Sequence, residues 1–455
     1  MFELSSKLQK YVNHTPYFLG NKFNYPYLKE RIEEHNFLLL DEEKQTKVKT
    51  SDLQYLKNSE EKFGFNIWDV WEITAQRSKR RRKKPTQKIL VGLEYFIKEL
   101  DFFLDKNEIT DFIIYGPSGP GDVILFKMLK QKKINIICLR GVALPRKFGI
   151  SNNLDNNLWK LKENYLNIKK RDLTKREQEE GLKVLQGYHT NNNKPDCALT
   201  FKESKINKLK QFLTKVYKAI KYKQLPSRFR PFFWKPIQSI YDHLGIFGNP
   251  VLNEKYILFP LHFQPEASTL IYGKWYNNQL AIIENLVRSI PLGYMLYVKE
   301  HSHGYGNRNL SFYKEIKKYA CVRLINPHQN NLELIKASSL VVTVTGTSGW
   351  EAIMFQKPTI IFGEAFYNIF NCVSKIERIT NLPNLIRSLL DKRIELKETL
   401  TCITALNKSS YPGLAFLPGD CAGNSSKEEN IELLAEGIKD YINKTQNNLD
   451  MSNFC

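Results

Sequence analysis

The segment from 341 to 363 constrains the fold of this chain more than any other part of the sequence. It reads as a buried strand, a turn of small residues, a short helix ended by Lys357-Pro358, and a second buried strand. A turn of this kind presents backbone N–H groups to an anion, and Gly346 and Gly349 would let a ligand approach the backbone closely. The pattern predicts a phosphate-binding turn in an α/β domain. Packing alone is the alternative reason for such a composition.

The same alternation of strands and helices surrounds this segment. Strands are predicted at 256–263, 294–299 and 322–325, and helices at 277–290, 310–319 and 331–337. An earlier βαβ unit is predicted from a strand at 111–115, a glycine turn at 116–121, a helix at 122–131 and a strand at 134–139. That turn has neither the GxGxxG nor the Walker spacing. Both runs predict open parallel sheets of the doubly wound kind.

The length of the chain predicts more than one domain. At 455 residues it is long for a single hydrophobic core, and two domains of about 200 residues each are expected. We place an N-terminal Rossmann-like domain with a helical insertion at 1–245 and a C-terminal Rossmann-like domain at 246–428. A final helix and a polar tail would occupy 429–455.

The net charge of +21 favours an anionic partner, such as a phosphorylated ligand or an anionic membrane surface. The predicted helix at 204–221 carries six lysines and no carboxylate around one apolar face, which suits adsorption to anionic lipid. A packed helix with a basic outer face is the alternative. Neither this helix nor the basic run at 77–84 contains a recognition module for nucleic acid, so we expect no nucleic-acid partner.

Cysteine usage and hydropathy indicate the compartment. The seven cysteines are scattered without a CxxC pair, so neither a disulfide framework nor a zinc site is predicted. No window reaches about 18 uninterrupted apolar residues. We expect a cytoplasmic protein. The basic helix at 204–221 would also support peripheral attachment to the inner face of the membrane.

Ligands of an open parallel sheet bind beyond the carboxyl ends of its strands, so the residues after each strand are the site candidates. Lys299 and His301 are two residues apart at a strand end and can offer two donors to a phosphate. Glu351, in the first turn of the helix after the phosphate turn, could accept hydrogen bonds from a ribose or only favour the helix N-terminus. Gln264 and Glu266 could bind sugar hydroxyls or act as acid and base.

Two other chemistries do not fit the sequence. No HExxH or DxD pattern accompanies the histidines at 301 and 303, so no metal is assigned. The Gly346-Thr-Ser-Gly349 turn is one residue short of the GxSxG elbow of serine hydrolases.

Three motifs carry a family likeness: His262-Phe-Gln-Pro-Glu-Ala-Ser268, Tyr297-Val-Lys-Glu-His301 and Thr345-Gly-Thr-Ser-Gly-Trp-Glu-Ala352. Together they resemble the capsule polysaccharide biosynthesis proteins, a group similar to the bacterial Kdo transferases of capsule and O-antigen assembly. The likeness covers roughly 250 to 370 well and 111 to 140 faintly. It implies a GT-B-like α/β fold, in which two Rossmann-like doubly wound domains face a cleft.

The resemblance also implies roles for individual residues. Lys299 and His301 match a Lys-x-His-Pro element whose histidine meets the donor phosphate. Ser302 stands where the family usually has proline, which predicts a looser turn. The remaining matches are Thr345, Thr347, Ser348 and Glu351. Together with the candidates taken from the residues themselves, the predicted donor-binding set is Gln264, Lys299, His301, Thr345, Gly346, Thr347, Ser348, Gly349 and Glu351, and Glu266 and His301 are the catalytic candidates.

The leading hypothesis is therefore a glycosyltransferase that moves a sugar from a nucleotide donor onto a glycan or lipid-linked acceptor. The resemblance implies CMP-Kdo or the nucleotide form of a related acidic sugar as that donor. The nucleotide-sugar is a substrate, and neither a cofactor nor a metal is expected, because cationic side chains and turn amides would neutralise the phosphate. A UDP-sugar 2-epimerase-like enzyme and a non-catalytic membrane-surface component of the capsule machinery are the alternatives.

Overall fold

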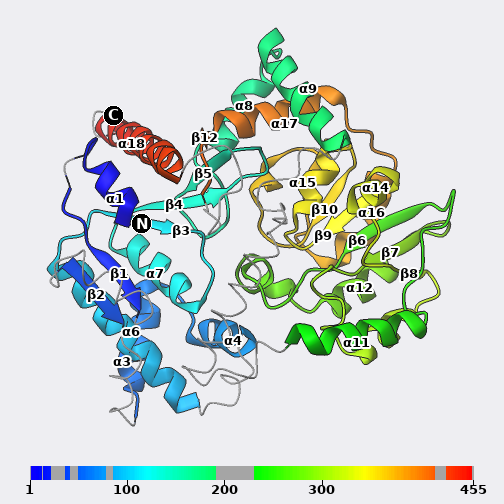
Figure 1. Ribbon diagram of the computed structural model, residues 1–455, viewed down its shortest axis with the longest axis horizontal. Coiled ribbons are helices and arrows are strands. Elements are labelled where there is room, and N and C mark those ends of the chain that lie inside the picture. The colour runs from blue at the N-terminus through cyan, green and yellow to red at the C-terminus, as the bar shows by residue number, and fades with distance from the viewer. Residues whose placement is uncertain are drawn as a thin grey trace. The chain divides into compact units, whose positions relative to one another are not determined.

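The computed structural model describes residues 2–12, 14–21, 36–40, 50–77, 86–190, 230–415 and 427–452. Contacts between residues divide the chain into two compact units (Figure 1). Unit 1 comprises residues 1–164, 265–267 and 406–455, and unit 2 comprises residues 165–264 and 268–405. These units differ from the boundaries predicted at 245 and 428, because the C-terminal part of the chain returns to pack with the N-terminal part.

Unit 2 is built on a six-stranded parallel sheet with the strand order β11-β10-β9-β6-β7-β8. The strands are β6 (Tyr256–Pro260), β7 (Met295–Lys299), β8 (Val322–Ile325), β9 (Leu340–Thr343), β10 (Thr359–Ile361) and β11 (Val373–Lys375). The chain runs outward through β7 and β8, then crosses back to β9 beside β6. This is the doubly wound Rossmann order predicted from the sequence, with its switch point between β6 and β9.

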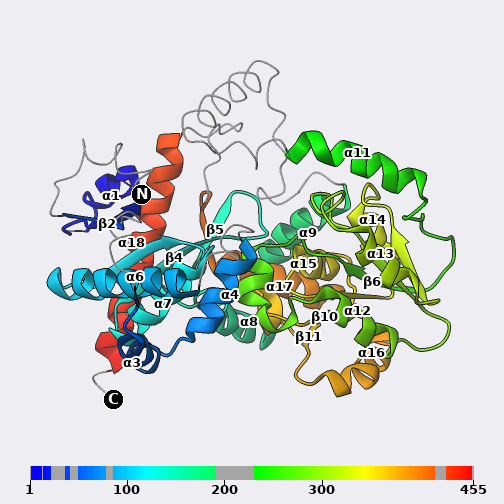
Figure 2. The same cartoon turned by 90° about the horizontal axis from the view of Figure 1, so that it is seen from below.

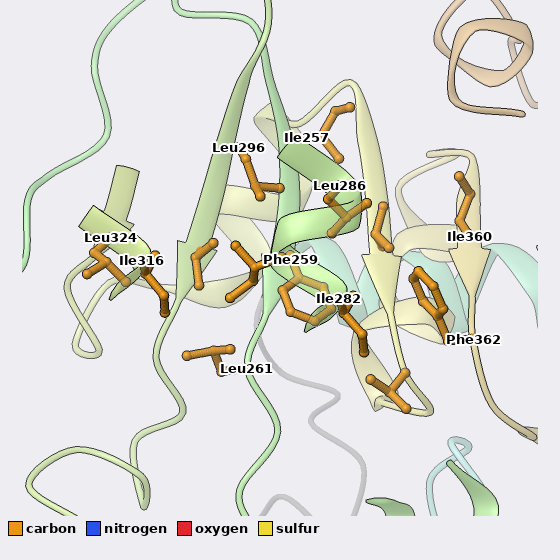
Figure 3. Packing of buried hydrophobic residues seen from close by; sticks show 14 of the residues in the cluster. Ile257, Phe259, Leu261, Ile282, Leu286, Leu296, Ile316, Leu324, Ile360 and Phe362 are labelled. Atoms are coloured by element: carbon orange, nitrogen blue, oxygen red, sulfur yellow. The ribbon is translucent and has the colours of Figure 1, made fainter. Parts of the chain in front are cut away.

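Helices cover both faces of this sheet, because alternate strand residues point to opposite faces and both sets are apolar. On one face Ile257 and Phe259 pack with Ile282 and Leu286 of α12 (Gln279–Val287), as Figure 3 shows. The same core includes residues of α13 (Leu310–Lys317) and α16 (Leu382–Leu390). On the other face Leu258 packs with residues of α14 (Asn331–Ala337) and α15 (Thr347–Met354). Figure 1 shows α14 and α15 on the side opposite to α12.

The described part of unit 2 has further helices around this core. They include α9 (Lys175–His189), the greater part of α17 (Leu396–Lys408) and α11 (Arg230–His243), the π-helical turn η5 (Ser268–Tyr272), and the 3-10 turns η6 (Lys274–Tyr276), η7 (Phe366–Ile369) and η8 (Ile379–Asn381). In α11, labelled in Figure 2, the Tyr241 hydroxyl donates to the Arg308 carbonyl at 2.8 Å. The predicted basic helix at 204–221 and most of the basic run at 77–84 lie outside the described residues.

Unit 1 contains a four-stranded sheet with the order β12-β5-β4-β3. The predicted βαβ unit is present as β3 (Asp111–Tyr115), α7 (Pro120–Gln131) and β4 (Asn135–Gly141), with β3 and β4 parallel. Beyond β4 the sheet departs from the doubly wound pattern. β5 (Lys147–Ser151) is antiparallel to β4, because the short connection between them reverses the chain, whereas a helical crossover would return it to run parallel. β12 (Ser410–Pro412) is antiparallel to β5.

Helices of unit 1 also cover both faces of its sheet. α3 (Leu53–Phe63), α4 (Ile67–Arg77), α6 (Thr86–Lys106) and α7 share a core with Ile136 and Cys138 of β4. On the other face α18 (Lys427–Ser452) and α1 (Phe2–Leu8) pack on Ile137 and Leu139 (Figure 1). The remaining elements are the parallel pair β1 (Phe18–Asn21) and β2 (Phe37–Leu40), and α8 (Leu161–Lys169), which spans the boundary between the units. No helix in the described part of the chain is long and apolar enough to span a membrane.

Candidate functional site

The predicted phosphate turn lies between β9 and α15, at the switch point of the unit 2 sheet. The amides of Val344 and Thr345 donate to the Nε2 atom of His262, at 3.2 and 3.4 Å, and the Gly346 amide donates to the Thr343 hydroxyl at 3.1 Å. These amides therefore hold the turn together. Helix α15 starts after Gly346 without a side-chain cap, and the Gly349 amide donates to the Gly346 carbonyl at 3.1 Å, so the amides of Thr347 and Ser348 are the donors that an anion would meet.

Gly346 and Gly349 are needed for packing inside the protein. A Cβ atom at Gly349 would lie 2.5 Å from the Tyr367 hydroxyl oxygen, and one at Gly346 would lie 2.8 Å from the Thr343 hydroxyl oxygen. The buried Tyr367 hydroxyl donates to the Gly346 carbonyl. The structure thus gives these glycines a packing reason, which was the alternative left open by the sequence.

His262, which follows β6, is the residue that organises this turn. Its side chain is buried, and its Nε2 atom lies 3.2 Å from the Thr343 hydroxyl in addition to the two amides. Because amide groups only donate, Nε2 must accept, and the ring proton lies on Nδ1. Burial, with His301 and Arg308 nearby, lowers the pKa of His262 to about 4, so the ring is neutral.

The backbone of His262 is held as firmly as its ring. Gln279 of α12 accepts from the His262 amide at 2.7 Å and donates to its carbonyl at 3.1 Å. Sequence reasoning listed the motif that begins with His262 but gave this residue no role. The available signal was its position directly after a buried strand.

His301 lies two residues beyond the end of β7. Its Nδ1 atom accepts from the His303 amide at 3.1 Å, so the proton of the neutral ring lies on Nε2. Burial, followed by His303, Lys299 and Arg308, lowers the pKa of this half-buried ring to about 4. The ring stacks on Phe263 with centroids 6.0 Å apart. His301 can therefore act as a neutral hydrogen-bond donor through Nε2.

Lys299 is buried at the end of β7. Its ammonium group donates to the Pro327 carbonyl at 3.1 Å and to the Glu300 carbonyl at 3.4 Å. Burial lowers the pKa of Lys299, while the negative charges of Glu300 and Glu351 oppose that shift. The structure thus ties this cation to backbone carbonyls and brings it within electrostatic reach of Glu351.

An ionic network that the sequence did not predict supports the loop after His301. Glu300 is fully buried, pairs with the Arg308 guanidinium at 2.9 Å, and accepts from the Tyr313 hydroxyl at 2.8 Å and the His301 amide at 2.6 Å. Burial raises the pKa of Glu300 while these partners lower it. Arg308 also donates to the His262 carbonyl, so one guanidinium links the two loops.

The turn after His301 is closed. The amides of Gly304 and Tyr305 donate to the His301 carbonyl at 2.8 and 3.1 Å, and Ser302 is exposed. These hydrogen bonds close the turn with serine at this position, and its greater looseness relative to a proline turn stays a prediction. Backbone hydrogen bonds and the buried Glu300 hold it, so the proline ring is not required for its shape.

The remaining candidates have varied surroundings. Glu351 accepts from the Asn331 side chain at 2.8 Å, and Asn331 also lies 3.3 Å from the Ser348 hydroxyl. The Thr345 hydroxyl donates to the Ser268 carbonyl at 3.0 Å, and Thr347 is exposed.

The two candidates that follow β6 fall in different units. The Gln264 side chain donates to the Asn277 carbonyl at 2.6 Å within unit 2. Glu266 is exposed and belongs to unit 1, whereas His301 belongs to unit 2.

One group among the described residues has the spacing of metal ligands. The sulfur atoms of Cys372 and Cys402 are 3.9 Å apart, and the Glu398 carboxylate lies within 4.8 Å of both. Burial raises the pKa of the Cys402 thiol well above its usual value, which favours the protonated thiol. Tyr165 donates to Glu398 at 2.5 Å. None of the predicted site residues belongs to this group.

Known proteins resemble this chain as follows. No curated protein matches its sequence. Among solved structures it is similar to the β-Kdo 2,7 transferase of KpsC from Thermosulfurimonas dismutans, with 13% identity and a TM-score of 0.40 over 74% of this chain and 89% of that chain. The β-Kdo 2,4 transferase of the same protein has 14% identity and a TM-score of 0.38, over 64% of this chain and 78% of that chain.

A UDP-GlcNAc 2-epimerase from Methanocaldococcus jannaschii gives 11% identity and a TM-score of 0.29, over 89% of this chain and 95% of that chain. Because these TM-scores are below 0.5, the fold class follows from the strand order described above and not from these similarities. The sequence model of the capsule polysaccharide biosynthesis protein family matches residues 251–374, which contain all three motifs. This match confirms the resemblance to the capsule polysaccharide biosynthesis proteins that the motifs predicted.

Proposed function

We propose that this protein is a glycosyltransferase of capsular or O-antigen polysaccharide synthesis that takes its sugar from a nucleotide donor. The observation that carries the proposal is the arrangement at the carboxyl edge of the unit 2 sheet. There α15 begins without a side-chain cap, in a family segment that also holds the His301 ring with its Nε2 proton available. Both features suit a diphosphate or phosphodiester leaving group.

The chemistry required of these groups is electrostatic. Departure of the nucleotide leaves negative charge on its phosphate, and donors fixed before the reaction stabilise that charge without rearranging. The His301 Nε2–H group and the first-turn amides of α15 would supply those donors. Glu351, held by Asn331, would accept from the ribose. CMP-Kdo or a related acidic sugar is the proposed donor, and a glycan or lipid-linked glycan the proposed acceptor.

The first experiment measures the melting temperature of the protein with CMP, UDP and GDP. A ligand that binds only the folded state raises that temperature, so the nucleotide of the donor should stand out. The matching nucleotide-sugar is then incubated with acceptor glycan. Turnover of UDP-GlcNAc without any acceptor would show an epimerase instead, and the absence of a shift with all three nucleotides would contradict the proposal.

The second experiment replaces His301 by alanine. Loss of one fixed donor to the leaving group should lower kcat by about 10²- to 10³-fold, with little change in melting temperature. His243→Ala is the matched control, because His243 is exposed at the end of α11 in the same unit. Turnover of the His301 variant at the wild-type rate would exclude the assigned role.

Transfer without a metal is a separate part of the proposal. If protein groups alone neutralise the phosphate, activity should persist in excess EDTA with no divalent cation added. Loss of activity in EDTA that Mg²⁺ or Mn²⁺ restores would contradict this part and leave the transferase assignment in place.

A further inference from the structure

We propose that Trp275 is a stacking platform for the pyranose ring of one substrate, with Lys274 beside it to receive the carboxylate of an acidic sugar. The inference deepens the proposed function, since it assigns a sugar subsite next to the phosphate turn. It concerns a residue that neither the three motifs nor the predicted site contains.

The connection that carries Trp275, called here the 268–277 loop, consists of the π-helical turn η5 and the 3-10 turn η6 and is fixed to the phosphate turn. The Thr345 hydroxyl donates to the Ser268 carbonyl at 3.0 Å, at the start of this loop. A Cβ atom at Gly273, two residues before Trp275, would lie 2.5 Å from a methyl carbon of Val344 and 3.5 Å from the Thr345 methyl carbon. The loop therefore packs directly on the turn.

The same loop is also fixed to the neighbouring strand ends. The Glu364 amide, after β10, donates to the Tyr272 carbonyl at 2.9 Å. The Tyr276 ring contacts Phe362 with centroids 5.1 Å apart, and Gln264, after β6, donates to the Asn277 carbonyl. Tethers thus lie on both sides of Trp275. Its side chain stands on a rigid support at the carboxyl edge of the sheet, where ligands of this fold bind.

Trp275 is itself unusually exposed for its type. Its side chain is 79% accessible, whereas tryptophan is buried on average in folded proteins. Two other strongly exposed apolar residues of unit 2, Leu252 and Leu292, precede β6 and β7 and so lie at the opposite end of the strands. A large indole face is therefore presented on the ligand side of the sheet. The C–H face of a pyranose ring is the natural partner of such a flat apolar surface.

Lys274 adds a charge preference to this surface. Its ammonium group lies 4.8 Å from the centroid of the Trp275 ring. The ammonium lies over one indole face, so a sugar that stacks there would displace it to the ring edge on its flexible stem, where a sugar carboxylate would gain a charge-assisted hydrogen bond. The pair thus favours an acidic sugar over a neutral one. The proposed donor sugar has this chemistry, and an acceptor that ends in an acidic sugar would share it.

The test compares Trp275→Ala and Trp275→Phe with Trp68→Ala, a matched control at an exposed tryptophan of α4 in unit 1. We expect Trp275→Ala to raise KM at least ten-fold for one substrate, Trp275→Phe to recover most of that loss, and the control to change neither KM. A rise in KM for the donor places the donor sugar on the indole, and a rise for the acceptor places the acceptor glycan there. Wild-type KM values for both substrates would overturn the inference.

A fluorescence titration keeps this test separate from the proposed function. Free Kdo should change the tryptophan emission of the wild-type protein and of Trp68→Ala, but not that of Trp275→Phe, and glucose should act only at higher concentration. This readout needs neither nucleotide nor turnover, so it can succeed even if the transferase assignment fails. If nucleotides still raise the melting temperature while Kdo leaves the emission unchanged in every variant, the platform is refuted and the transferase assignment is not.

Discussion

His262 shows how one buried side chain can shape a turn that it does not belong to. Its unprotonated Nε2 atom accepts from two backbone amides of the turn between β9 and α15. If that nitrogen were protonated, its N–H group would face two backbone N–H groups, and both hydrogen bonds would be lost. The neutral ring is therefore a condition for the shape of the turn, and the turn should be sensitive to acid.

The sign of this sensitivity follows from the pKa. In the native protein the pKa of His262 is lowered to about 4, below its usual value near 6.5, so the unfolded chain binds the extra proton first. Stability from this residue is complete above pH 6.5 and is lost as the pH falls toward 4. We expect a contribution on the order of 3 kcal/mol to disappear across that window, and urea unfolding at pH 7, 6 and 5 measures it.

His262→Asn provides the comparison. Its amide oxygen could still accept from the turn but does not titrate, so the variant should be less stable at pH 7 and lose less stability on acidification. His243→Asn, at an exposed histidine, should behave as the wild type does. Equal slopes of stability against pH for wild type and His262→Asn would rule out this account of the ring.

At the scale of an element, the loop from 300 to 309 depends on a buried charge. Glu300 is fully buried against Arg308 and Tyr313, and its other oxygen holds the His301 amide. Removing one partner of such a pair leaves an uncompensated charge in the interior. The loop that positions His301 should therefore fail when Arg308 is lost.

Arg308→Met should lower the free energy of unfolding by about 3–5 kcal/mol, as measured by urea denaturation at pH 7. The matched control is Arg288→Met, whose exposed pair with Glu284 on α12 should contribute at most about 0.5 kcal/mol. Replacing Glu300 by Gln in the Arg308→Met background should recover part of the loss. A change as small as that of the control would show that the buried pair is not what holds the loop.

At the scale of the whole molecule, unit 1 is assembled from the two ends of the chain. Helix α18 buries Ile431, Leu434 and Ile438 against β4 and β5, which lie almost 300 residues earlier in sequence. Unit 1 therefore cannot complete its core until the C-terminal helix is present. Unit 2 has its own core and does not use α18.

Ile438→Ala should consequently destabilise unit 1 by about 2–5 kcal/mol through the cavity that it leaves. Peptide-resolved hydrogen exchange should show faster exchange in β4 and β5 and no change in β6 to β9. Glu436→Ala, at an exposed position of the same helix, should leave both units unchanged. Faster exchange in both units would mean that they unfold together.

Local patterns were sufficient for most of the secondary structure. The strands at 111–115 and 322–325 and the helix at 331–337 coincide with their predictions. A parallel strand that is buried on both faces appears in the sequence as a continuous apolar run, and a short helix between two strands has turn residues at both ends. Each of these sequence signals lies within about ten residues, so it can be recognised locally. The same local character allowed the three motifs to identify the family segment.

The sequence by itself thus determined the α/β class and the doubly wound character of unit 2, and it predicted ligand binding at the strand ends. Only the tertiary structure decided the strand order and which side chains gather at that edge. The tie between His262 and Val344, the ion pair of Glu300, and the return of α18 to unit 1 all join residues through space. A one-dimensional pattern records which face of an element is apolar but not which partner covers it, because the partner is selected by packing and by the hydrogen bonds left unsatisfied after folding.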